Sequence, residues 1–319
     1  MQQFEKATGR LAFVFPGQGS QLPGMGQAVH DGSAAARAVF AEADRVLCRP
    51  ITELCLTAPA DVLEDTATAQ PAILTVSIAI LEAIRERAKV DGVDVTPSVV
   101  AGHSLGEFTA MVAADVLDLS TALQLVQERG TLMRRAGIER PGGMAAVIGL
   151  EDETLDAICH AASDQGIVTI ANANCPGQVV ISGELPALTR AMELATEAGA
   201  RRVVRLPVSI ASHSPLMSGV AARMGELIGK APLRPPRFPI VANVTAAPIT
   251  TVAEVRTELK TQVERPVNWT RSVRAMIDGG ATTFVEIGPG QVLGGLIKRI
   301  SREVTIVSGQ DALFGRPAR

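Results

Sequence analysis

The chain has 319 residues, of which 47% are hydrophobic and 20% charged, a balance that excludes disordered and collagen-like proteins. Its 30 Lys and Arg residues against 33 Asp and Glu residues give a net charge of −3, which does not favour a nucleic-acid-binding protein. The longest apolar stretch, residues 72–84, is shorter than a membrane helix, and the apolar run 11–15 is too short for a signal peptide. We therefore expect a cytoplasmic protein without a membrane span.

The cysteines give no sign of a metal or disulfide site. None of Cys48, Cys55, Cys159 and Cys175 forms a C-x-x-C pair, so the spacing predicts neither a zinc site nor a disulfide framework. We expect four reduced cysteines that mostly pack in the interior.

Strand-like and helix-like segments alternate from the N-terminus. The apolar run 11–15 stops at Pro16-Gly-Gln-Gly-Ser20, which is typical of a buried strand followed by a loop. The next expected elements are a buried helix over 70–90 that begins at Pro71, a strand over 98–101, and helices over 106–114 and 120–136. This order predicts a parallel α/β sheet.

The order changes between about residues 140 and 207. The expected elements there are a strand at 144–150, a helix at 152–163, strands at 167–172 and 178–182, a helix at 186–198 and a strand at 201–207. This βαββαβ order is that of the ferredoxin-like unit. We expect residues 140–207 to form a small subdomain inserted into a large α/β subdomain of residues 1–139 and 208–319. Strands over 238–243 and 283–287 and a helix over 293–300 complete the large subdomain.

The pentapeptide Gly102-His-Ser-Leu-Gly106 matches G-x-S-x-G between a predicted strand and a predicted helix. The flanking glycines permit a sharp turn that exposes the serine hydroxyl above the sheet edge. We interpret Ser104 as a nucleophile, and the alternative is a glycine-rich turn with an incidental serine.

A serine hydroxyl needs a base within hydrogen-bonding reach, and the chain has only four histidines. His30 and His160 lie in outer segments, and His103 would have to fold back over the turn. His213 remains, in a loop between Pro207 and Pro215. We favour it as the base over a solvated loop histidine.

No carboxylate stands out as the third member of a catalytic triad. Asp278 and Glu286 lie downstream, but the sequence selects neither. A backbone carbonyl can orient an imidazole equally well.

Two further features suit acyl transfer. An oxyanion hole requires two N–H groups, one of which would come from Leu105. The loop 16–21 is the best candidate for the second donor, and the alternative is an ordinary turn at the end of a strand. Arg129, before Gly130, would bind a carboxylate if it pointed inward. Periodicity alone leaves a surface salt bridge equally open.

Several motifs in the same order resemble those of malonyl-CoA:acyl carrier protein transacylases and the related acyltransferase domains of polyketide synthases. They are Phe15-Pro-Gly-Gln-Gly-Ser-Gln21, Gly102-His-Ser-Leu-Gly106, Gln127-Glu-Arg-Gly130, Pro176-Gly-Gln-Val-Val-Ile-Ser-Gly183, Ser212-His213, Pro266-Val-Asn-Trp269 and Glu286-Ile-Gly-Pro-Gly290. The resemblance covers residues 11–304 and implies an α/β-hydrolase-like large subdomain with an inserted ferredoxin-like small one.

The resemblance also implies a ping-pong transfer of a malonyl group from malonyl-CoA to the phosphopantetheine thiol of acyl carrier protein. We expect a monomer without a cofactor or metal. The implied roles are nucleophile for Ser104, base for His213, oxyanion donors for Gln18 and Leu105, carboxylate binding for Arg129, and orientation of the histidine by the Gln262 carbonyl.

A basic surface is expected for docking of the acidic carrier protein. The candidates are Lys298, Arg299 and Arg302, or Arg201, Arg202 and Arg205, and for each a merely solvated face is the alternative.

The sequence departs from the family's patterns at two places, of which the first bears on the substrate. Ser212 before the histidine resembles methylmalonyl-selective polyketide enzymes, although fatty acid enzymes also carry serine there. Asn172-Ala-Asn174 lacks the aromatic residue that relatives often have between the asparagines.

Three alternatives to a malonyl transferase stay open. They are a polyketide acyltransferase for another extender unit, a serine esterase or thioesterase, and an inactive module that binds a carrier protein. A buried Arg129 would argue against a hydrolase of neutral esters, because a buried cation is costly to desolvate.

Overall fold

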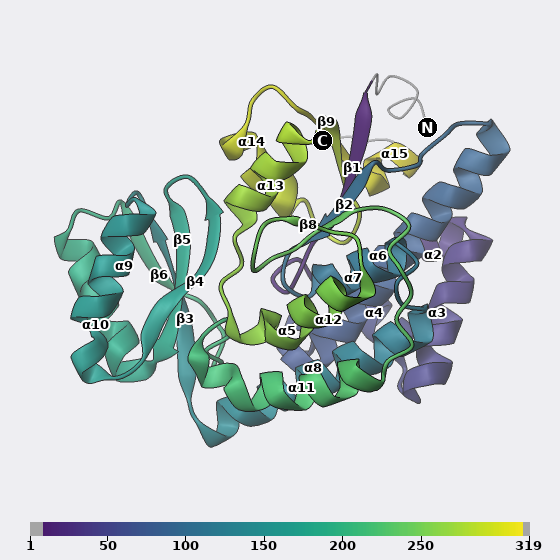
Figure 1. Ribbon diagram of the computed structural model, residues 1–319. Coiled ribbons are helices and arrows are strands. Elements are labelled where there is room, and N and C mark those ends of the chain that lie inside the picture. Colours follow the sequence, from purple (N-terminus) through teal and green to yellow (C-terminus); the bar gives the residue numbers. More distant parts are fainter. Residues whose placement is uncertain (1–8, 315–319) are drawn as a thin grey trace.

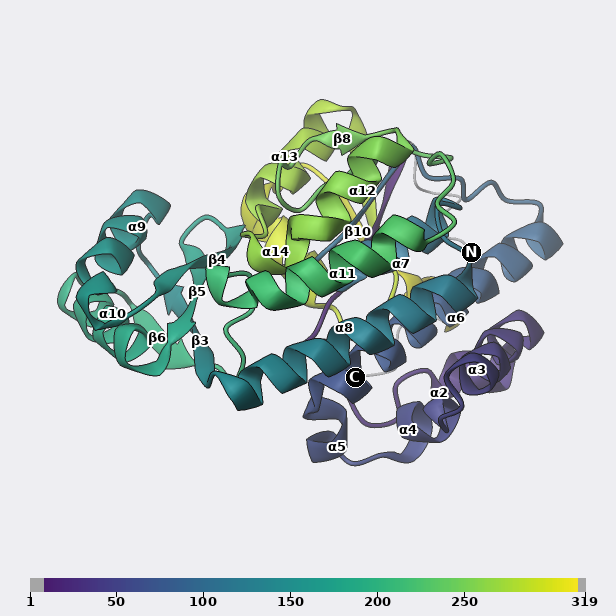
Figure 2. The same ribbon diagram turned by 60° about the horizontal axis from the view of Figure 1, so that its bottom comes forward.

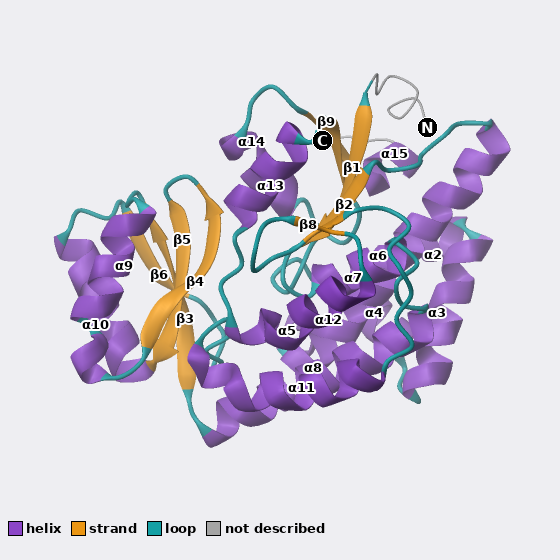
Figure 3. Cartoon of the chain, in the orientation of Figure 1, coloured by secondary structure: helices purple, strands orange, loops and turns teal. Residues whose placement is uncertain are grey.

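Two β-sheets organise the chain in the computed structural model, which describes residues 9–314. The larger sheet has the order β10-β9-β1-β2-β7-β8 and is parallel except for its edge strand β8. The smaller sheet is antiparallel, with the order β4-β5-β3-β6. Figures 1 and 3 show it with its two helices at one side of the molecule, beside the larger sheet and its helices.

The strands of the larger sheet are β1 (Arg10–Phe15), β2 (Val99–Gly102), β7 (Ile240–Val241), β8 (Pro248–Ile249), β9 (Ala281–Glu286) and β10 (Thr305–Ser308). The α-helices around it are α2 (Gln27–Gly32), α3 (Ala34–Leu47), α4 (Ile51–Thr57), α5 (Ala60–Glu64), α6 (Thr66–Asp91), α7 (Gly106–Ala113), α8 (Leu119–Glu139), α11 (Ser218–Lys230), α12 (Val252–Thr261), α13 (Trp269–Asp278), α14 (Val292–Ile300) and α15 (Gly309–Phe314). Short 3-10 helices occupy Pro215–Met217 and Gln262–Glu264.

The central strand β1 explains why both faces of the larger sheet are covered. Leu11, Phe13 and Phe15 belong to the hydrophobic core on one face, whereas Ala12 and Val14 belong to the core on the other. Successive side chains of a strand point to opposite faces, so a continuous apolar run is expected in a strand buried on both sides. The first core contains α6, α7, α8 and α11, and the second contains α13 and α14.

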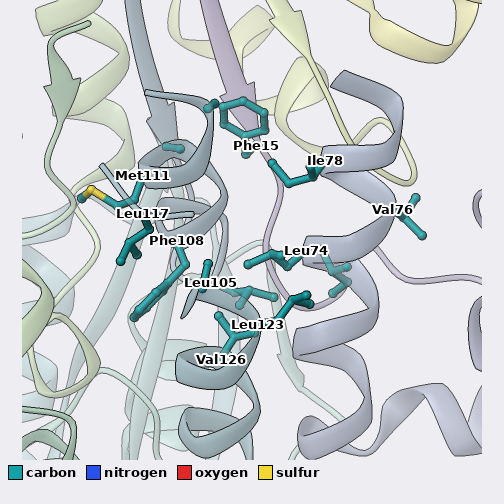
Figure 4. Packing of buried hydrophobic residues seen from close by; sticks show 14 of the residues in the cluster. Phe15, Leu74, Val76, Ile78, Leu105, Phe108, Met111, Leu117, Leu123 and Val126 are labelled. Carbon is teal, nitrogen blue, oxygen red and sulfur yellow. The ribbon is translucent and has the colours of Figure 1, made fainter. Parts of the chain in front are cut away.

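Helices α6, α7 and α8 pack tightly beneath the larger sheet, and α11 lies beside α8 (Figure 2). Figure 4 shows Leu105 and Phe108 of the α7 region facing Leu123 of α8 and Leu74 of α6, whereas Val76 points to the other side of α6. This packing fixes the start of α7, where the G-x-S-x-G turn ends.

Helix α6 begins earlier than predicted. Asp65 caps it by accepting a hydrogen bond from the Thr68 N–H, which places Pro71 inside the helix and not at its start. Proline has no N–H for the Ala67 carbonyl one turn earlier, and Arg49 Nη1 donates to that oxygen at 2.9 Å instead. Within residues 9–314, α6 is the one helix long and apolar enough to span a membrane, but 94% of its apolar window is buried in the protein. It is a core helix.

The smaller sheet confirms the predicted βαββαβ order and the ferredoxin-like fold. Its elements are β3 (Gly142–Ile148), α9 (Asp152–Ala161), a 3-10 turn (Ser163–Gln165), β4 (Val168–Cys175), β5 (Gln178–Glu184), α10 (Leu185–Glu197) and β6 (Arg202–Arg205). Helices α9 and α10 cover one face. The other face carries a small apolar cluster around Met144, Ala171 and Val180.

The fold class is therefore as expected, an α/β-hydrolase-like region with an inserted ferredoxin-like one. The subdomain limits at 139/140 and 207/208 stay a prediction, and the outer limits 1 and 319 lie outside the described residues. The strand predicted over 238–243 is shorter, because Pro239 lacks a ladder donor and the Asn243 N–H donates to Glu107. The sequence patterns did not predict helices α2 to α5 or α11 to α13.

Candidate active site

A cavity of about 530 Å³ lies between the carboxyl end of the larger sheet and the open face of the smaller one. The loop after β1, the turn after β2 and the loop before α11 contribute to its wall from the large region. Met144, Val180 and Val208 line it from the smaller sheet and its exit. Ligands of open α/β sheets bind at this end of the strands.

Ser104 lies at the sharp turn between β2 and α7. Its φ of 51° is in the left-handed region, which is unfavourable for a residue with a side chain. The chain crosses the loop after β1 so closely that a Cβ on Gly106 would lie 2.0 Å from the Phe15 carbonyl oxygen. The sequence therefore requires glycine at this place, and the turn presents the Ser104 hydroxyl to the cavity.

The backbone of Ser104 is held on both sides by amide side chains. Asn243 Oδ1 accepts a hydrogen bond from the Ser104 N–H at 2.7 Å, and Gln262 Nε2 donates to the Ser104 carbonyl at 2.6 Å. Asn243 Nδ2 donates to the Gly102 carbonyl at 2.7 Å and to Glu107 Oε1 at 3.1 Å. These contacts stabilise the strained turn from behind.

Glu107 and Glu258 are buried in this network, and neither lines the cavity. Burial, followed by the neighbouring Glu258, raises the pKa of Glu107 well above its usual range. Burial also raises the pKa of Glu258. These acids hold backbone and Asn243 groups, since Glu107 accepts from the Asn243 N–H and Glu258 accepts from the Val244 N–H.

His213 meets the hydroxyl of Ser104 across the cavity floor. Its Nε2 lies 2.7 Å from Ser104 Oγ. Its Nδ1 donates to the carbonyl oxygens of Gln262 at 2.9 Å and Arg265 at 3.0 Å. This arrangement selects the tautomer whose Nε2 accepts the serine proton. The predicted Gln262 carbonyl is thus in place, and the Arg265 carbonyl is a second acceptor that the sequence did not indicate.

The orienting groups are backbone carbonyls and not a carboxylate. Glu286 instead accepts hydrogen bonds from the Leu293 and Gly294 N–H groups at the start of α14. Burial, followed by the charge of Arg129, lowers the pKa of His213 to about 3. The imidazole is therefore neutral at neutral pH.

Arg129 points inward from α8 and is 2% exposed. The backbones of α8 and α6 approach closely at Gly130, where a Cβ would lie 2.8 Å from the Thr66 carbonyl oxygen. Arg129 Nη2 donates to Ser104 Oγ at 3.2 Å and to Gln262 Oε1 at 3.1 Å, and Nη1 donates to Gln70 Oε1 at 2.8 Å. Burial lowers its pKa to about 10, so the guanidinium stays charged at neutral pH.

Gln18 lines the cavity, and Leu105 directly follows Ser104, which also lines it. Within residues 9–314 neither the Gln18 nor the Leu105 backbone N–H donates a hydrogen bond, while the Gln18 side chain donates to Thr66 Oγ1 at 3.0 Å. The loop after β1 packs against the turn so closely that a Cβ on Gly17 would lie 2.4 Å from the His103 carbonyl oxygen. Because Asn243 occupies the Ser104 N–H, Leu105 is the nearest free backbone donor of the turn.

The other histidines lie away from the serine hydroxyl. His103 Nε2 lies 2.8 Å from Asn174 Oδ1, which links the turn to β4, and burial lowers its pKa. His30 and His160 lie on α2 and α9. In the described part of the chain no three His, Cys, Asp or Glu side chains gather as metal ligands.

The other arginines of α8 and the candidate docking residues lie outside the cavity. Arg134 and Arg135 are exposed and pair with Asp65 and Glu139. The six candidate docking residues, Lys298, Arg299, Arg302, Arg201, Arg202 and Arg205, are all exposed, and Arg299 Nη1 donates to Gln178 Oε1 at 2.6 Å. Cys48 is exposed and the three other cysteines are buried and unpaired.

Three contacts of the site had no prediction: the amides of Gln70 and Asn243 and the side chain of Gln262. Gln70 is a polar residue in an apolar helical run, and Asn243 follows a strand at the carboxyl edge of the sheet. Both positions are signals that could have pointed to the site.

Comparison with known proteins shows the family of the chain. Residues 12–311 match the acyl transferase domain family. A malonyl CoA-acyl carrier protein transacylase of Bacillus subtilis is 40% identical over 303 residues, which cover 95% of this chain and 94% of that protein.

Two solved structures are also similar to this chain. An acyl carrier protein S-malonyltransferase from Vibrio cholerae has a TM-score of 0.89 at 39% identity, covering 95% of this chain and 99% of that one. A malonyl-transacylase solved in complex with its type II PKS acyl-carrier protein has a TM-score of 0.90 at 37% identity, covering 96% and 100%. The chain therefore belongs to the acyl transferase domain family and, within it, to the malonyl CoA-acyl carrier protein transacylases.

Proposed function

We propose that the protein transfers a malonyl group from malonyl-CoA to the phosphopantetheine thiol of an acyl carrier protein, through a malonyl ester of Ser104. One observation carries this proposal: a serine in contact with a neutral histidine lies 3.2 Å from a buried arginine in the same cavity. A nucleophile, a base and a carboxylate-binding cation are the three groups that this transfer requires.

The first half-reaction acylates the enzyme. His213 Nε2 takes the proton of Ser104 Oγ as the oxygen attacks the thioester carbonyl of malonyl-CoA. The N–H groups of Gln18 and Leu105 stabilise the oxyanion of the tetrahedral intermediate. When the carbon–sulfur bond breaks, the imidazolium returns its proton to the sulfur and coenzyme A leaves.

The second half-reaction is the reverse chemistry with another thiol. Arg129 keeps the malonyl carboxylate in place while the phosphopantetheine thiol enters and His213 takes its proton. The sulfur attacks the ester carbonyl, and the Ser104 oxygen leaves with the proton from the imidazolium. The carbonyl oxygens of Gln262 and Arg265 hold the imidazole in the same orientation throughout.

Arg129 distinguishes this reaction from hydrolysis of neutral esters. A cation that is 2% exposed is unfavourable unless a ligand supplies the opposite charge. A free carboxylate on the acyl group does so, and a neutral acyl group does not.

The remaining features of the proposal concern the surroundings of the reaction. The mechanism uses side chains and backbone groups of one chain, so it requires neither a cofactor nor a second subunit, and we propose a monomer. The four unpaired cysteines support a reducing, cytoplasmic location. The exposed basic residues 298, 299 and 302, or 201, 202 and 205, are the proposed docking surface for an acidic carrier protein.

The intact mass of the protein after mixing with malonyl-CoA, methylmalonyl-CoA or acetyl-CoA tests the proposal. We expect a malonyl adduct that is absent in Ser104→Ala and weakened in Arg129→Ala. Equal loading of acetyl and malonyl groups, or release of coenzyme A by hydrolysis without an adduct, would favour a hydrolase. The methylmalonyl arm tests the extender unit, because Ser212 lines the cavity with a small side chain.

A further inference from the structure

Every hydrogen-bonding partner of the Arg129 guanidinium is uncharged. The partners are Gln70 Oε1, Gln262 Oε1 and Ser104 Oγ, and the ring of Phe108 lies 5.9 Å from its Cζ. Arg129 forms no ion pair with a carboxylate anywhere in residues 9–314, and its buried Nε has no hydrogen-bond partner there. A fully buried cation of this kind normally has a carboxylate beside it.

The shortest of these contacts comes from Gln70 on α6. Gln70 is fully buried, and its Oε1 lies 2.8 Å from Arg129 Nη1. Its Nε2 faces only the sulfur of Met133, at 3.2 Å, and a thioether is a weak acceptor. A glutamate has the same length and shape, so it could place a carboxylate oxygen where Gln70 Oε1 lies and would lose only the sulfur contact.

The second amide, Gln262, is constrained in a way that Gln70 is not. Gln262 Nε2 donates to the Ser104 carbonyl at 2.6 Å, so that side chain must keep an N–H donor to hold the turn. Position 70 has no such requirement. Its neutrality is therefore not explained by packing or by hydrogen bonding.

We propose that Gln70 is a specificity-determining residue, which holds Arg129 through a neutral oxygen so that the carboxylate of the acyl group is the only carboxylate in direct contact with the guanidinium. The inference rests on the proposed function, in which Arg129 binds that carboxylate. Gln70 orients the guanidinium without satisfying its charge. The desolvation cost of the cation is then relieved when a malonyl group enters, and it is not relieved by an acetyl group.

The variant Gln70→Glu tests this inference, because it adds an internal carboxylate at the same place. The rates of Ser104 acylation by malonyl-CoA and by acetyl-CoA are measured over a range of concentrations of each. We expect the ratio of kcat/KM for malonyl-CoA to kcat/KM for acetyl-CoA to fall by roughly 10- to 100-fold, mainly through a higher KM for malonyl-CoA. Losing one hydrogen bond to a charged group weakens binding by about this factor.

The matched control is Gln70→Met, which removes the acceptor oxygen without adding a charge. The methionine side chain is similar in length to glutamine and would lie beside Met133. It is expected to slow both substrates through poorer orientation of Arg129 while the preference for malonyl-CoA stays within about threefold of wild type. A preference lost as completely as in Arg129→Ala would overturn the inference, even if Gln70→Glu failed to fold.

One result with Gln70→Glu also bears directly on the inference. A malonyl preference within about threefold of wild type in a folded variant, checked by its thermal midpoint, would also overturn it. The proposed function is judged separately, from the malonyl adduct of the wild-type protein and its dependence on Ser104 and Arg129, and it can hold whatever position 70 does.

Discussion

The two walls of the cavity are built on different principles. The floor, which comprises Ser104, His213, Arg129, Gln262 and Asn243, is a continuous network of hydrogen bonds between distant parts of the chain. The roof, which comprises Met144, Val180, Leu206 and Val208 on the open face of the smaller sheet, is an apolar surface.

The difference separates two tasks. The floor holds reacting groups in a fixed geometry, including a strained backbone at Ser104 that isolated packing would not maintain. The roof provides shape and excludes water, for which apolar contact is sufficient. Changes at Ser104, His213 or Asn243 in the floor should therefore lower kcat, and changes in the roof should alter KM.

The largest effect is expected for Ser104→Ala in the floor. Without the nucleophile no ester can form, and we expect transfer to fall by about ten-thousandfold or more. Intact mass after mixing with malonyl-CoA should show no adduct, and a separate assay should follow malonyl transfer to the carrier protein. An adduct of undiminished yield in this variant would place the acylated residue elsewhere.

A smaller loss is expected for Asn243→Ala, which acts on the floor without touching the substrate. It leaves the Ser104 N–H and the Gly102 carbonyl without their side-chain partner, so the turn relaxes and the hydroxyl shifts. We expect kcat to fall by about 10- to 100-fold, because a nucleophile misplaced by about 1 Å can slow a reaction by about 100-fold. KM should stay nearly unchanged.

Asn268→Ala is the matched control for this prediction. Its amide donates to the Val244 carbonyl at 2.6 Å and does not contact the turn at Ser104. Both variants should lose thermal stability, but only Asn243→Ala should lose kcat. If kcat fell equally in the two, Asn243 would support the fold and not the nucleophile.

A change in the roof is expected to have a milder effect. Val180→Ala removes two methyl groups from the cavity lining, and a loss of about 1 kcal/mol of apolar contact corresponds to roughly a fivefold higher KM with little change in kcat. The neighbour Val179 points to the opposite face, beneath α9 and α10, and Val179→Ala should reduce stability without altering KM. A drop in kcat for Val180→Ala would show that the roof takes part in positioning.

The smallest change is expected in the pH profile of the wild-type protein. Since the pKa of His213 is lowered to about 3, the imidazole is already deprotonated above that pH. We expect kcat/KM for acylation to vary by less than about twofold between pH 7 and 5, where a base with the ordinary histidine pKa of about 6.5 would lose more than about tenfold.

Arg129→Gln sharpens the same measurement. Removing the cation removes one of the causes that lower the pKa of His213, so the acid limb of the profile should move to higher pH. A wild-type profile that falls with a midpoint near 6.5 would contradict the buried, neutral base.

The sequence predicted what depends on local pattern. The apolar run 11–15, the alternation of strand-like and helix-like segments and the βαββαβ order predicted the two sheets, and G-x-S-x-G in its strand-to-helix context predicted the place of Ser104. The orientation of Arg129 could not be decided from helical periodicity, because it depends on the approach of α6 at Gly130.

Contacts between distant residues escaped prediction for a related reason. Asn243 and Ser104 are 139 positions apart, and they meet only because β2 and β7 are neighbours in the sheet. Helices α4, α5, α11 and α12, which were not predicted, lack the long apolar run that α6 has, since they pack with one face only.

The proline inside α6 has a consequence for how this sequence can change over time. Arg49 donates to the Ala67 carbonyl that Pro71 leaves without a helical donor, and to Thr68 Oγ1 at 3.2 Å. That helical turn carries both Thr66, which contacts the Gln18 side chain, and Gln70. Losing Arg49 alone would leave a carbonyl unsatisfied, at about 1–3 kcal/mol, whereas a residue with an N–H at position 71 would make Arg49 dispensable. Positions 49 and 71 should therefore covary among relatives, although neither lines the cavity.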